Sequence, residues 1–457
     1  MITATQAPEH YLGAFDQFNH RAATQLGWLK SLRQEGFARF AENGFPTTHD
    51  EDWRFTNVAP ISSREFRPAS PASIETDQLR SFGASGFECQ LVFVNGKFSR
   101  ELSQIESLPP EVRICGLAEE LGTNAGQVRE HLGQYLNFRR DPFAALNTAF
   151  LEDGAYVYVP RGTVLAQPVY VLFITVPSAD AIMEHPRNLI VVEENSQATI
   201  VEDYVSLGDS TAPSFSNTAT ELVAGENAVV SHYMIVRQGD SSFNVSTLRI
   251  QQARTSNVAT HSLLLSGALV RNNVHPVLAG EGAECLINGL FMANGRQHMD
   301  NYMLVEHASP HCNSRQFYNG ILSGHGHGVF HGRIIVHKDA QKTDAKQTNR
   351  NLLLSDDAQI DTKPQLEIYA DDVKCTHGAT IGQVEENALF YLRSRGLDES
   401  AAKHLLLLAF ANECLDRMNS VQVRKHLERL VMEWLPESAS HSGEKPAEIE
   451  RAWEEVG

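Results

Sequence analysis

Apolar residues recur every three or four positions near both ends of the chain, whereas the middle alternates with a period of two. The spacing from Phe18 to Phe40 predicts one amphipathic helix that ends at Asn43-Gly44. Toward the other end, Asp398 can cap a helix with the same spacing, and a further helix follows over 423–434, before Pro436. Helices are therefore expected on both sides of a central β region.

The first 150 residues predict a mixed region. An apolar strand over 91–94 is closed by the turn residues Asn95-Gly96, and a helix is expected from about Leu132 to Leu146. We assign residues 1–150 to an N-terminal, partly helical α/β region.

Residues 151–382 show short alternating runs separated by polar turns, with no long helical period. Turn sequences such as Glu194-Asn195-Ser196 and Gly225-Glu226-Asn227 recur roughly every 25 to 31 residues, which indicates stacked units. A sandwich of this length would split at a linker, and the region contains none, whereas a parallel β-helix simply adds rungs. The fold class is therefore mainly β, with a parallel β-helix whose open ends the flanking helices can cover.

The chain after the β-helix divides into two parts. Residues 383–436 predict a helical domain, and 437–457 form a polar, acidic tail that we expect to be mobile. The wide apolar stripe around Leu405, Leu406 and Phe410 suits either an ordinary core or an exposed helix that docks a partner.

Residues 338–351 are almost wholly polar although they lie between two apolar strands. They are too polar for a core strand. We expect either a solvated edge or a polar surface that docks a partner or a sugar-like ligand.

Charge and cysteine usage narrow the class of protein. The 38 basic and 56 acidic residues give a net charge of −18, which would repel nucleic acid. Six widely spaced cysteines without a CxxC pair indicate free thiols in a reducing compartment. The beginning of the sequence does not look like a signal peptide, and no run reaches the ~18 apolar residues of a membrane span, so we expect a soluble, cytoplasmic protein.

Signatures of catalysis are missing from the sequence, which contains no phosphate-binding loop, nucleophile elbow, HExxH or GxGxxG motif. The densest histidine cluster consists of His325, His327, His331 and His337, which share parity and could face one side of a strand. Neutral imidazoles in this pattern could bind a transition metal, but the intervening glycines favour a loop or the edge of a rung.

Cys375 and His377 are two residues apart, so on a strand both side chains point the same way. A thiolate beside an imidazole suits iron or an iron-sulfur intermediate. Two ligands cannot close a site, so this function would need ligands from another chain. The alternative is a buried cysteine beside a hydrogen-bonded histidine.

Three long stretches carry a resemblance to a known family. DPFAALNTAF (141–150), GRIIVHKDAQKTDAKQTNRNLLLSDDAQIDTKPQLEIYADDVKCTHGATIGQ (332–383) and FYLRSRGL (390–397) resemble the SufB/SufD family, most closely its SufD branch. The resemblance implies a right-handed parallel β-helix core flanked by N-terminal α/β and C-terminal helical regions.

The resemblance also implies partners and a function. It implies a non-catalytic scaffold that forms a heterodimer with SufB through the β-helix, and that docks the SufC ATPase through C-terminal helices, with Leu405, Leu406 and Phe410 at the contact. An iron-sulfur cluster would assemble transiently at the shared interface. ATP binding would bring two SufC subunits together and shift that interface. A homodimer in isolation is left open, as is binding of flavin or iron by this chain.

Two departures from the SufB pattern separate the branches. Ile368 stands where SufB-like chains carry a cysteine, and Gly378 stands where they carry a glutamate. His377 matches the family's interface histidine, so it is the expected shared metal ligand, with Cys375 a second candidate.

Two other classes of protein compete with this hypothesis. A β-helix can host a carbohydrate-active enzyme, although the sequence shows no clear carboxylate constellation at strand spacing. A self-associating structural protein without cluster chemistry would leave His377 without a role.

Overall fold

A computed structural model describes residues 9–21, 26–83, 86–105, 108–109, 111–208 and 212–435. The acidic tail predicted for 437–457 lies outside these residues. Among them, none of the helices combines the length and the apolar character that a membrane span requires.

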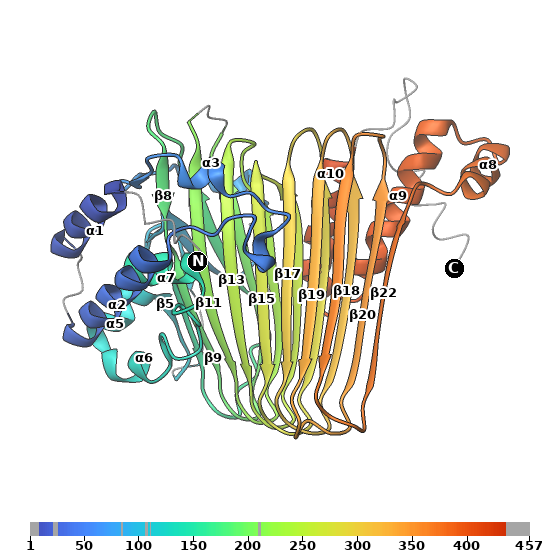
Figure 1. The fold of residues 1–457 in the computed structure, drawn as a ribbon. Coiled ribbons are helices and arrows are strands. Elements are labelled where there is room, and N and C mark those ends of the chain that lie inside the picture. Colours follow the sequence, from blue (N-terminus) through green and yellow to red (C-terminus); the bar gives the residue numbers. More distant parts are fainter. Residues whose placement is uncertain are drawn as a thin grey trace.

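The centre of the molecule is a parallel β-helix whose successive strands alternate between two sheets (Figure 1). This confirms the architecture that the turn spacing predicted. Sheet A contains β1 (Arg67–Pro68), β5 (Arg113–Gly116), β6 (Ala155–Val159), β8 (Ile182–Glu184), β9 (Arg187–Val192), β11 (Ser214–Ala224), β13 (Ser242–Gln252), β15 (Leu269–Leu278), β17 (His298–His307), β19 (His327–Val336) and β21 (Gln359–Ile368). Sheet B contains β2 (Cys89–Val94), β3 (Lys97–Phe98), β4 (Gln104–Ile105), β7 (Val169–Thr175), β10 (Gln197–Ser206), β12 (Val229–Arg237), β14 (Asn257–Ser266), β16 (Glu284–Ala293), β18 (Asn313–Leu322), β20 (Asp344–Leu353) and β22 (Lys374–Gly382).

The two sheets enclose an apolar lumen. Alternate residues of each strand point inward, and stacked positions such as Ile190, Leu222 and Ile250 form one continuous core with Ile200 and Val230 of the opposite sheet. Burial of this core is the main favourable term for the fold. Because each rung contacts only its neighbours, the rungs at the two ends depend on whatever covers them.

Tight turns connect the strands at one edge of the solenoid, as the sequence predicted. Asn195, Asn227 and Thr255 adopt positive φ angles of 58°, 56° and 53° in successive turns. Asparagine tolerates this left-handed region better than most residues. The Asn95-Gly96 turn likewise joins β2 and β3 as an antiparallel hairpin.

The N-terminal region packs against the first rungs (Figure 1). Its helices are α1 (Glu9–Arg21), α2 (Gly27–Asn43), the 3-10 helix η1 (Glu51–Trp53), α3 (Ala59–Ser62), α4 (Thr76–Arg80), α5 (Leu117–Thr123), α6 (Ala125–His131) and α7 (Pro142–Ala149). The single helix predicted from Phe18 to Phe40 is wrong, because two helices share that span and Leu26 is extended. The predicted end is correct: α2 stops before Gly44, whose φ is 63°.

The helix predicted from about Leu132 to Leu146 is also wrong. Gly133 adopts a positive φ, and α7 begins only at Pro142. The Asp141 carboxylate caps α7 by accepting hydrogen bonds from the backbone N–H groups of Phe143 and Ala144, so the helix cannot start earlier.

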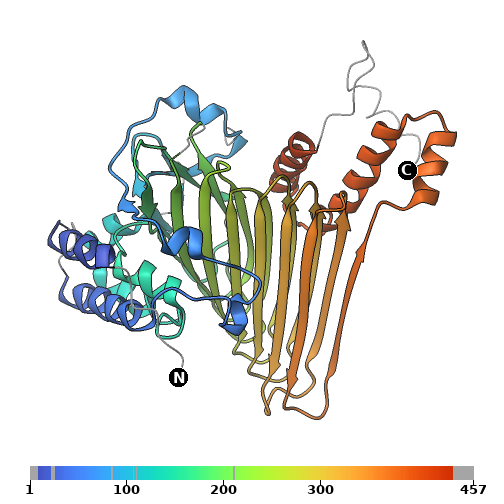
Figure 2. The same cartoon turned by 45° about the horizontal axis from the view of Figure 1, so that its top comes forward.

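Three helices follow the last rung: α8 (Glu386–Ser394), α9 (Glu399–Leu415) and α10 (Val421–Trp434). Asp398 caps α9 as predicted. The C-terminal part of α9 and α10 cover the outer face of sheet B, whereas α8 extends away from the solenoid (Figures 1 and 2). Asn288 and Asn319 anchor α9 by donating to the carbonyls of Cys414 and Phe410.

The polar segment expected at an edge is in fact an interior strand. β20 lies between β18 and β22, and Gln347, Asn349 and Asn351 are buried. The expectation was wrong because side chains of this strand find hydrogen-bond partners on the adjacent rung: the Gln347 amide N–H donates to the Gln316 side-chain carbonyl at 2.8 Å, and the Asn349 amide N–H donates to the Tyr318 backbone carbonyl at 3.2 Å.

Candidate functional site

The two ends of the β-helix differ in how they are closed. At the first end, antiparallel β3, β4 and β5 add to the sheets, and the N-terminal region covers them. At the last end, β21 pairs only with β19, and β22 pairs only with β20, within the part of the chain that the structure describes. The terminal rung therefore leaves unpaired backbone groups on both sheets, which is a template for a further strand.

The two predicted site residues lie on this rung. Cys375 pairs in register with Ala345, and His377 pairs with Gln347. Ala345 belongs to the lumen core, so Cys375 and His377 both lie on the lumen-facing side of β22. The sequence prediction that both side chains point the same way is consistent with this register.

Cys375 is a free, half-buried thiol that packs against the end of the lumen core. Burial is the main reason that its pKa is raised, and the charge of Asp344 acts in the same direction. A raised pKa disfavours the thiolate, which is the nucleophile and the metal ligand. In the isolated chain Cys375 therefore resembles a packing residue more than an activated thiol.

His377 is exposed, because no further rung of the described chain stacks upon β22. Among the described residues, no side chain or backbone group hydrogen-bonds its ring. An imidazole whose ring has no hydrogen-bond partner can offer a ring nitrogen as a ligand for iron. The described residues contain no group of three or more His, Cys, Asp or Glu side chains that could hold a metal ion, so His377 would act only with ligands from outside.

Apolar side chains surround this open rung. Ile368 and Tyr369, at the end of β21, are 41% and 63% exposed, and Ile381 on β22 is 51% exposed. Ile368 and Tyr369 lie beside the turn between β21 and β22, whereas Ile381 lies at the far end of β22. Exposed apolar groups along an unpaired sheet edge are typical of a protein interface. The sequence pattern does not reveal this role for the three residues, since their strands resemble earlier rungs and only their position at the end exposes them.

The predicted docking residues on α9 separate into two kinds. Phe410 is only 8% exposed and packs under the Arg350 guanidinium, so it belongs to the packing of α9 on sheet B. Leu405 and Leu406 are half-buried, and the buried face of α9 instead runs through Leu407. The stripe predicted around Leu405, Leu406 and Phe410 is therefore divided, because Phe410 packs on sheet B whereas Leu405 and Leu406 are only half-buried.

An exposed aromatic pair lies on α8. Phe390 is 74% exposed and Tyr391 is 56% exposed, although both are large apolar side chains. The guanidinium of Arg395 lies 5.2 Å from the Tyr391 ring. Two adjacent aromatic residues among charged neighbours are the sequence signal that could have identified this surface.

The histidine cluster does not converge on one point. His327 and His331 share the outer face of β19, but they contact different partners, Asp361 at 2.8 Å and Gln365 at 2.6 Å. His325 and His337 lie in the flanking turns near Asp357 and Glu306, respectively. Each of these contacts joins side chains on neighbouring rungs, and the four histidines do not face a common point.

Comparison with protein families finds two models that together match most of the chain. Residues 5–171 match the N-terminal region of SufBD proteins, and residues 174–410 match the SufBD core domain of the SUF system for FeS cluster assembly. The core model extends through the terminal rung, α8 and most of α9.

Curated relatives match over nearly their full length. An iron-sulfur cluster assembly SufBD family protein of Synechocystis is 36% identical over 420 residues, which are 90% of this chain and 92% of the relative. The iron-sulfur cluster assembly protein SufD of Escherichia coli is 30% identical over 93% of this chain and 98% of its own length. SufD of Bacillus subtilis is 25% identical over 93% of this chain and 97% of its own length.

Proposed function

The chain belongs to the SufBD family of iron-sulfur cluster assembly proteins, and on that premise we propose that it is a non-catalytic scaffold subunit of a SufB-SufC-SufD complex. In this proposal the terminal rung pairs with SufB, the C-terminal helical region 383–436 docks SufC, and ATP hydrolysis occurs in SufC.

The open terminal rung is the observation that carries the proposal. Its two strands have unpaired edges, and Ile368, Tyr369 and Ile381 add exposed apolar area beside them. A second β-helix of the same family could continue both sheets and cover these side chains. That arrangement would bury backbone groups that otherwise depend on water.

His377 would then become part of a shared site. It lies on the lumen-facing side of the rung that the partner covers, and no described residue occupies its ring nitrogens. One imidazole from this chain and ligands from SufB could hold iron while a nascent cluster, the cargo of the complex, is assembled. Cys375 is the weaker candidate, since its pKa is raised by burial.

The surface proposed for SufC consists of the aromatic pair on α8 and the half-buried Leu405 and Leu406 on α9. Phe410 would support this surface from behind by fixing α9 to sheet B. Large exposed aromatic side chains are enriched where proteins bind one another tightly.

The connection between these two surfaces is short. Only residues 383–385 separate the end of β22 from the start of α8. A force that moves α8 would therefore act almost directly on the strand that carries His377. This supports coupling of ATP-driven movement in SufC to the shared interface through rigid elements.

Co-expression of the chain with SufB and SufC, followed by anaerobic purification, tests the assembly. Ile381→Asp should weaken SufB retention severalfold, because it places a charge in the proposed interface. Val421→Asp is the matched control, since Val421 is also exposed but lies on α10. Equal SufB retention by both variants would contradict the proposed rung-to-rung pairing.

SufC docking is tested separately with the double variant Phe390→Ala and Tyr391→Ala. We expect loss of SufC with retention of SufB, whereas Met432→Ala, a 52% exposed residue on α10, should retain both. Analytical ultracentrifugation of the chain alone would reveal a homodimer formed through the same rung, and Ile381→Asp should dissociate it.

A further inference from the structure

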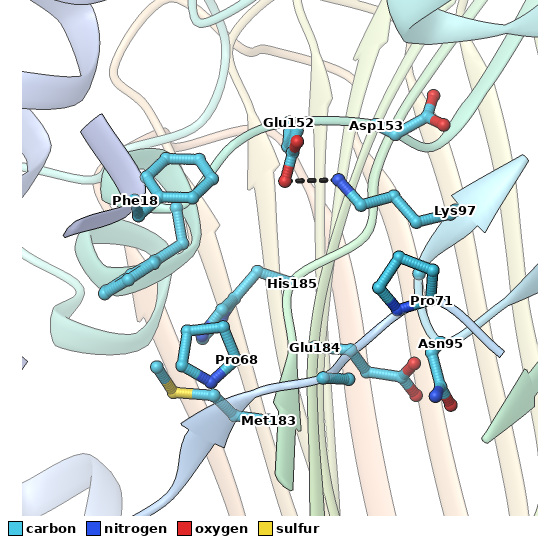
Figure 3. Close-up of a pocket in the computed structure, with 13 residues that line it drawn as sticks. Phe18, Pro68, Pro71, Asn95, Lys97, Glu152, Asp153, Met183, Glu184 and His185 are labelled. Atoms are coloured by element: carbon cyan, nitrogen blue, oxygen red, sulfur yellow. Dashed lines mark ion pairs between the residues drawn. The ribbon is translucent and has the colours of Figure 1, made fainter. Parts of the chain in front are cut away.

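A cavity of about 210 Å³ lies far from the terminal rung, where the N-terminal region meets the first rungs (Figure 3). Phe18 of α1, Pro68 of β1, the β2–β3 turn and the end of β8 each contribute to its wall. Its lining combines apolar rings with a small number of polar groups, which is the usual composition of a small-molecule site.

His185 supplies a buried hydrogen-bond donor without a partner. Its side chain lines the cavity and is 9% exposed, and Nε2 has no hydrogen-bond partner. The Asn217 amide donates to the Phe143 carbonyl and lies 3.2 Å from His185 Nδ1, so Nδ1 accepts and Nε2 carries the proton. Burial lowers the pKa of His185 to about 3, which keeps this neutral donor form at physiological pH.

Glu184 supplies a buried acidic group beside it. Its carboxyl oxygen Oε1 accepts from the Thr175 and Ser216 hydroxyls, each at 2.6 Å. No cation of the described chain pairs with Glu184, and burial raises its pKa. A buried carboxylate without a counter-ion is costly, so a cationic group in the cavity would stabilise it.

An ion pair between Lys97 and Glu152 also lines the cavity, together with the Asp153 carboxylate, which accepts from the backbone N–H groups of Phe98, Ala118 and Gly154 (Figure 3). Phe18, Phe150 and Met183 provide apolar surface near these charges. The neighbouring Gly96 leaves room, because a Cβ at this position would point toward Glu184, 3.4 Å from its Cβ. The lining thus offers donors for an anion, acceptors for a cation and an apolar wall within one small volume.

We propose that this cavity binds a small zwitterion of the α-amino acid class with an apolar side chain. The ligand carboxylate accepts from His185 Nε2 and Lys97, its ammonium faces Glu184 and Glu152, and its side chain packs against the phenylalanine rings. The proposal does not depend on the function assigned to the terminal rung, because no residue is shared between the two sites.

Isothermal titration of the full chain with L-leucine and L-phenylalanine tests the proposal. Two analogues of leucine dissect the charges: 4-methylpentanoate lacks the ammonium group and 3-methylbutylamine lacks the carboxylate. We expect saturable binding of an amino acid and a loss of roughly tenfold or more in affinity for each analogue. Binding of neither amino acid, or equal binding of an analogue, would overturn the proposal.

Three variants locate the binding. Glu184→Gln keeps the shape and an acceptor for Thr175 and Ser216, and Lys97→Met removes the cation at the half-exposed rim; each should weaken binding about tenfold or more. Arg100→Met, which removes an exposed cation paired with Glu119, is the matched control and should bind as the wild type does. If Glu184→Gln fails to fold, as judged by circular dichroism, Lys97→Met still decides the outcome.

Hydrogen exchange gives an independent readout of position. Because Phe18 lines the cavity, a bound amino acid should slow amide exchange in α1 relative to α10. Protection confined to another region would place the ligand elsewhere and contradict the proposal.

Discussion

The first and last rungs of the β-helix are built from similar strands but are finished in opposite ways. At the first end, Arg187 and Glu221 form a fully buried ion pair, and Glu221 also accepts from backbone N–H groups of the N-terminal region. At the last end, Arg333 and Glu367 form a comparable pair at 2.6 Å, but both side chains remain about a third exposed.

This difference separates a role in stability from a role in recognition. Buried polar contacts hold the N-terminal region on the first rungs; their net contribution to stability is small, but removing one partner of such a contact is strongly destabilising. The last rung keeps its edges and apolar side chains available. A repeat architecture permits this division, because each rung contacts only its neighbours.

The largest expected effect comes from breaking the buried pair. Arg187→Met leaves Glu221 charged and buried without its cation, which should lower the free energy of unfolding by about 3 to 5 kcal/mol. Urea denaturation followed by circular dichroism measures the change. A loss below about 1 kcal/mol would show that the capped end does not depend on this pair.

A second test compares the packed and projecting parts of α9. Phe410→Ala removes a ring that packs on sheet B, so the free energy of unfolding should fall by about 3 kcal/mol. Leu406→Ala truncates a half-buried side chain, so the free energy of unfolding should fall by about 1 kcal/mol or less. Thermal unfolding of the two variants provides the measurement. Equal losses would contradict the division of α9 into a support and a surface.

The buried histidines predict a pH dependence. His261 is 1% exposed, and burial lowers its pKa to about 3. As the pH falls below about 6.5, the unfolded chain therefore binds a proton at this residue that the folded chain does not bind. Stability should therefore fall as the pH drops from 6.5 toward 4, by about 1.4 kcal/mol per pH unit for this one group. His261→Gln should reduce the slope of urea-measured stability against pH by that amount. Above pH 7.5 the free energies of unfolding of the two proteins should differ by a constant amount. The same slope of stability against pH in both proteins below pH 6 would contradict this role of His261.

The smallest effect is expected at the open end. Arg333→Met removes one partner of a partly exposed ion pair, so the free energy of unfolding should fall by less than about 1 kcal/mol. The same urea titration that tests Arg187→Met measures it. A loss as large as that of Arg187→Met would abolish the contrast between the two ends.

Local patterns in the sequence predicted the elements that depend on local physics. Strand alternation and the spaced turns predicted the β-helix, Asn95-Gly96 predicted a hairpin, and Asp398 predicted a cap. For the hairpin and the cap, the residues that determine the structure lie within a few positions of one another, and each rung of the β-helix repeats the same local pattern of strand and turn.

Features that depend on distant partners could not be predicted in this way. β20 can lie inside the sheet because its amide side chains bond to groups such as the Gln316 side-chain carbonyl, about thirty residues away on the adjacent rung. His185 is an unusual donor because Asn217 sets its tautomer. Ile381 is exposed because, within residues 9–435 as far as the structure describes them, no rung comes after β22.

The role of His377 at the open rung is the central claim, and one comparison tests it most directly. The chain is co-expressed with SufB and SufC and purified without oxygen, and iron and acid-labile sulfide per complex are measured for wild type, His377→Ala and Thr376→Ala. Thr376 is the matched control, since it is exposed on the same strand but faces the opposite side. We expect an intact complex in all three and a severalfold loss of cluster only in His377→Ala. An unchanged cluster content in His377→Ala, with the complex intact, would contradict this expectation and place the assembly chemistry wholly in the partner.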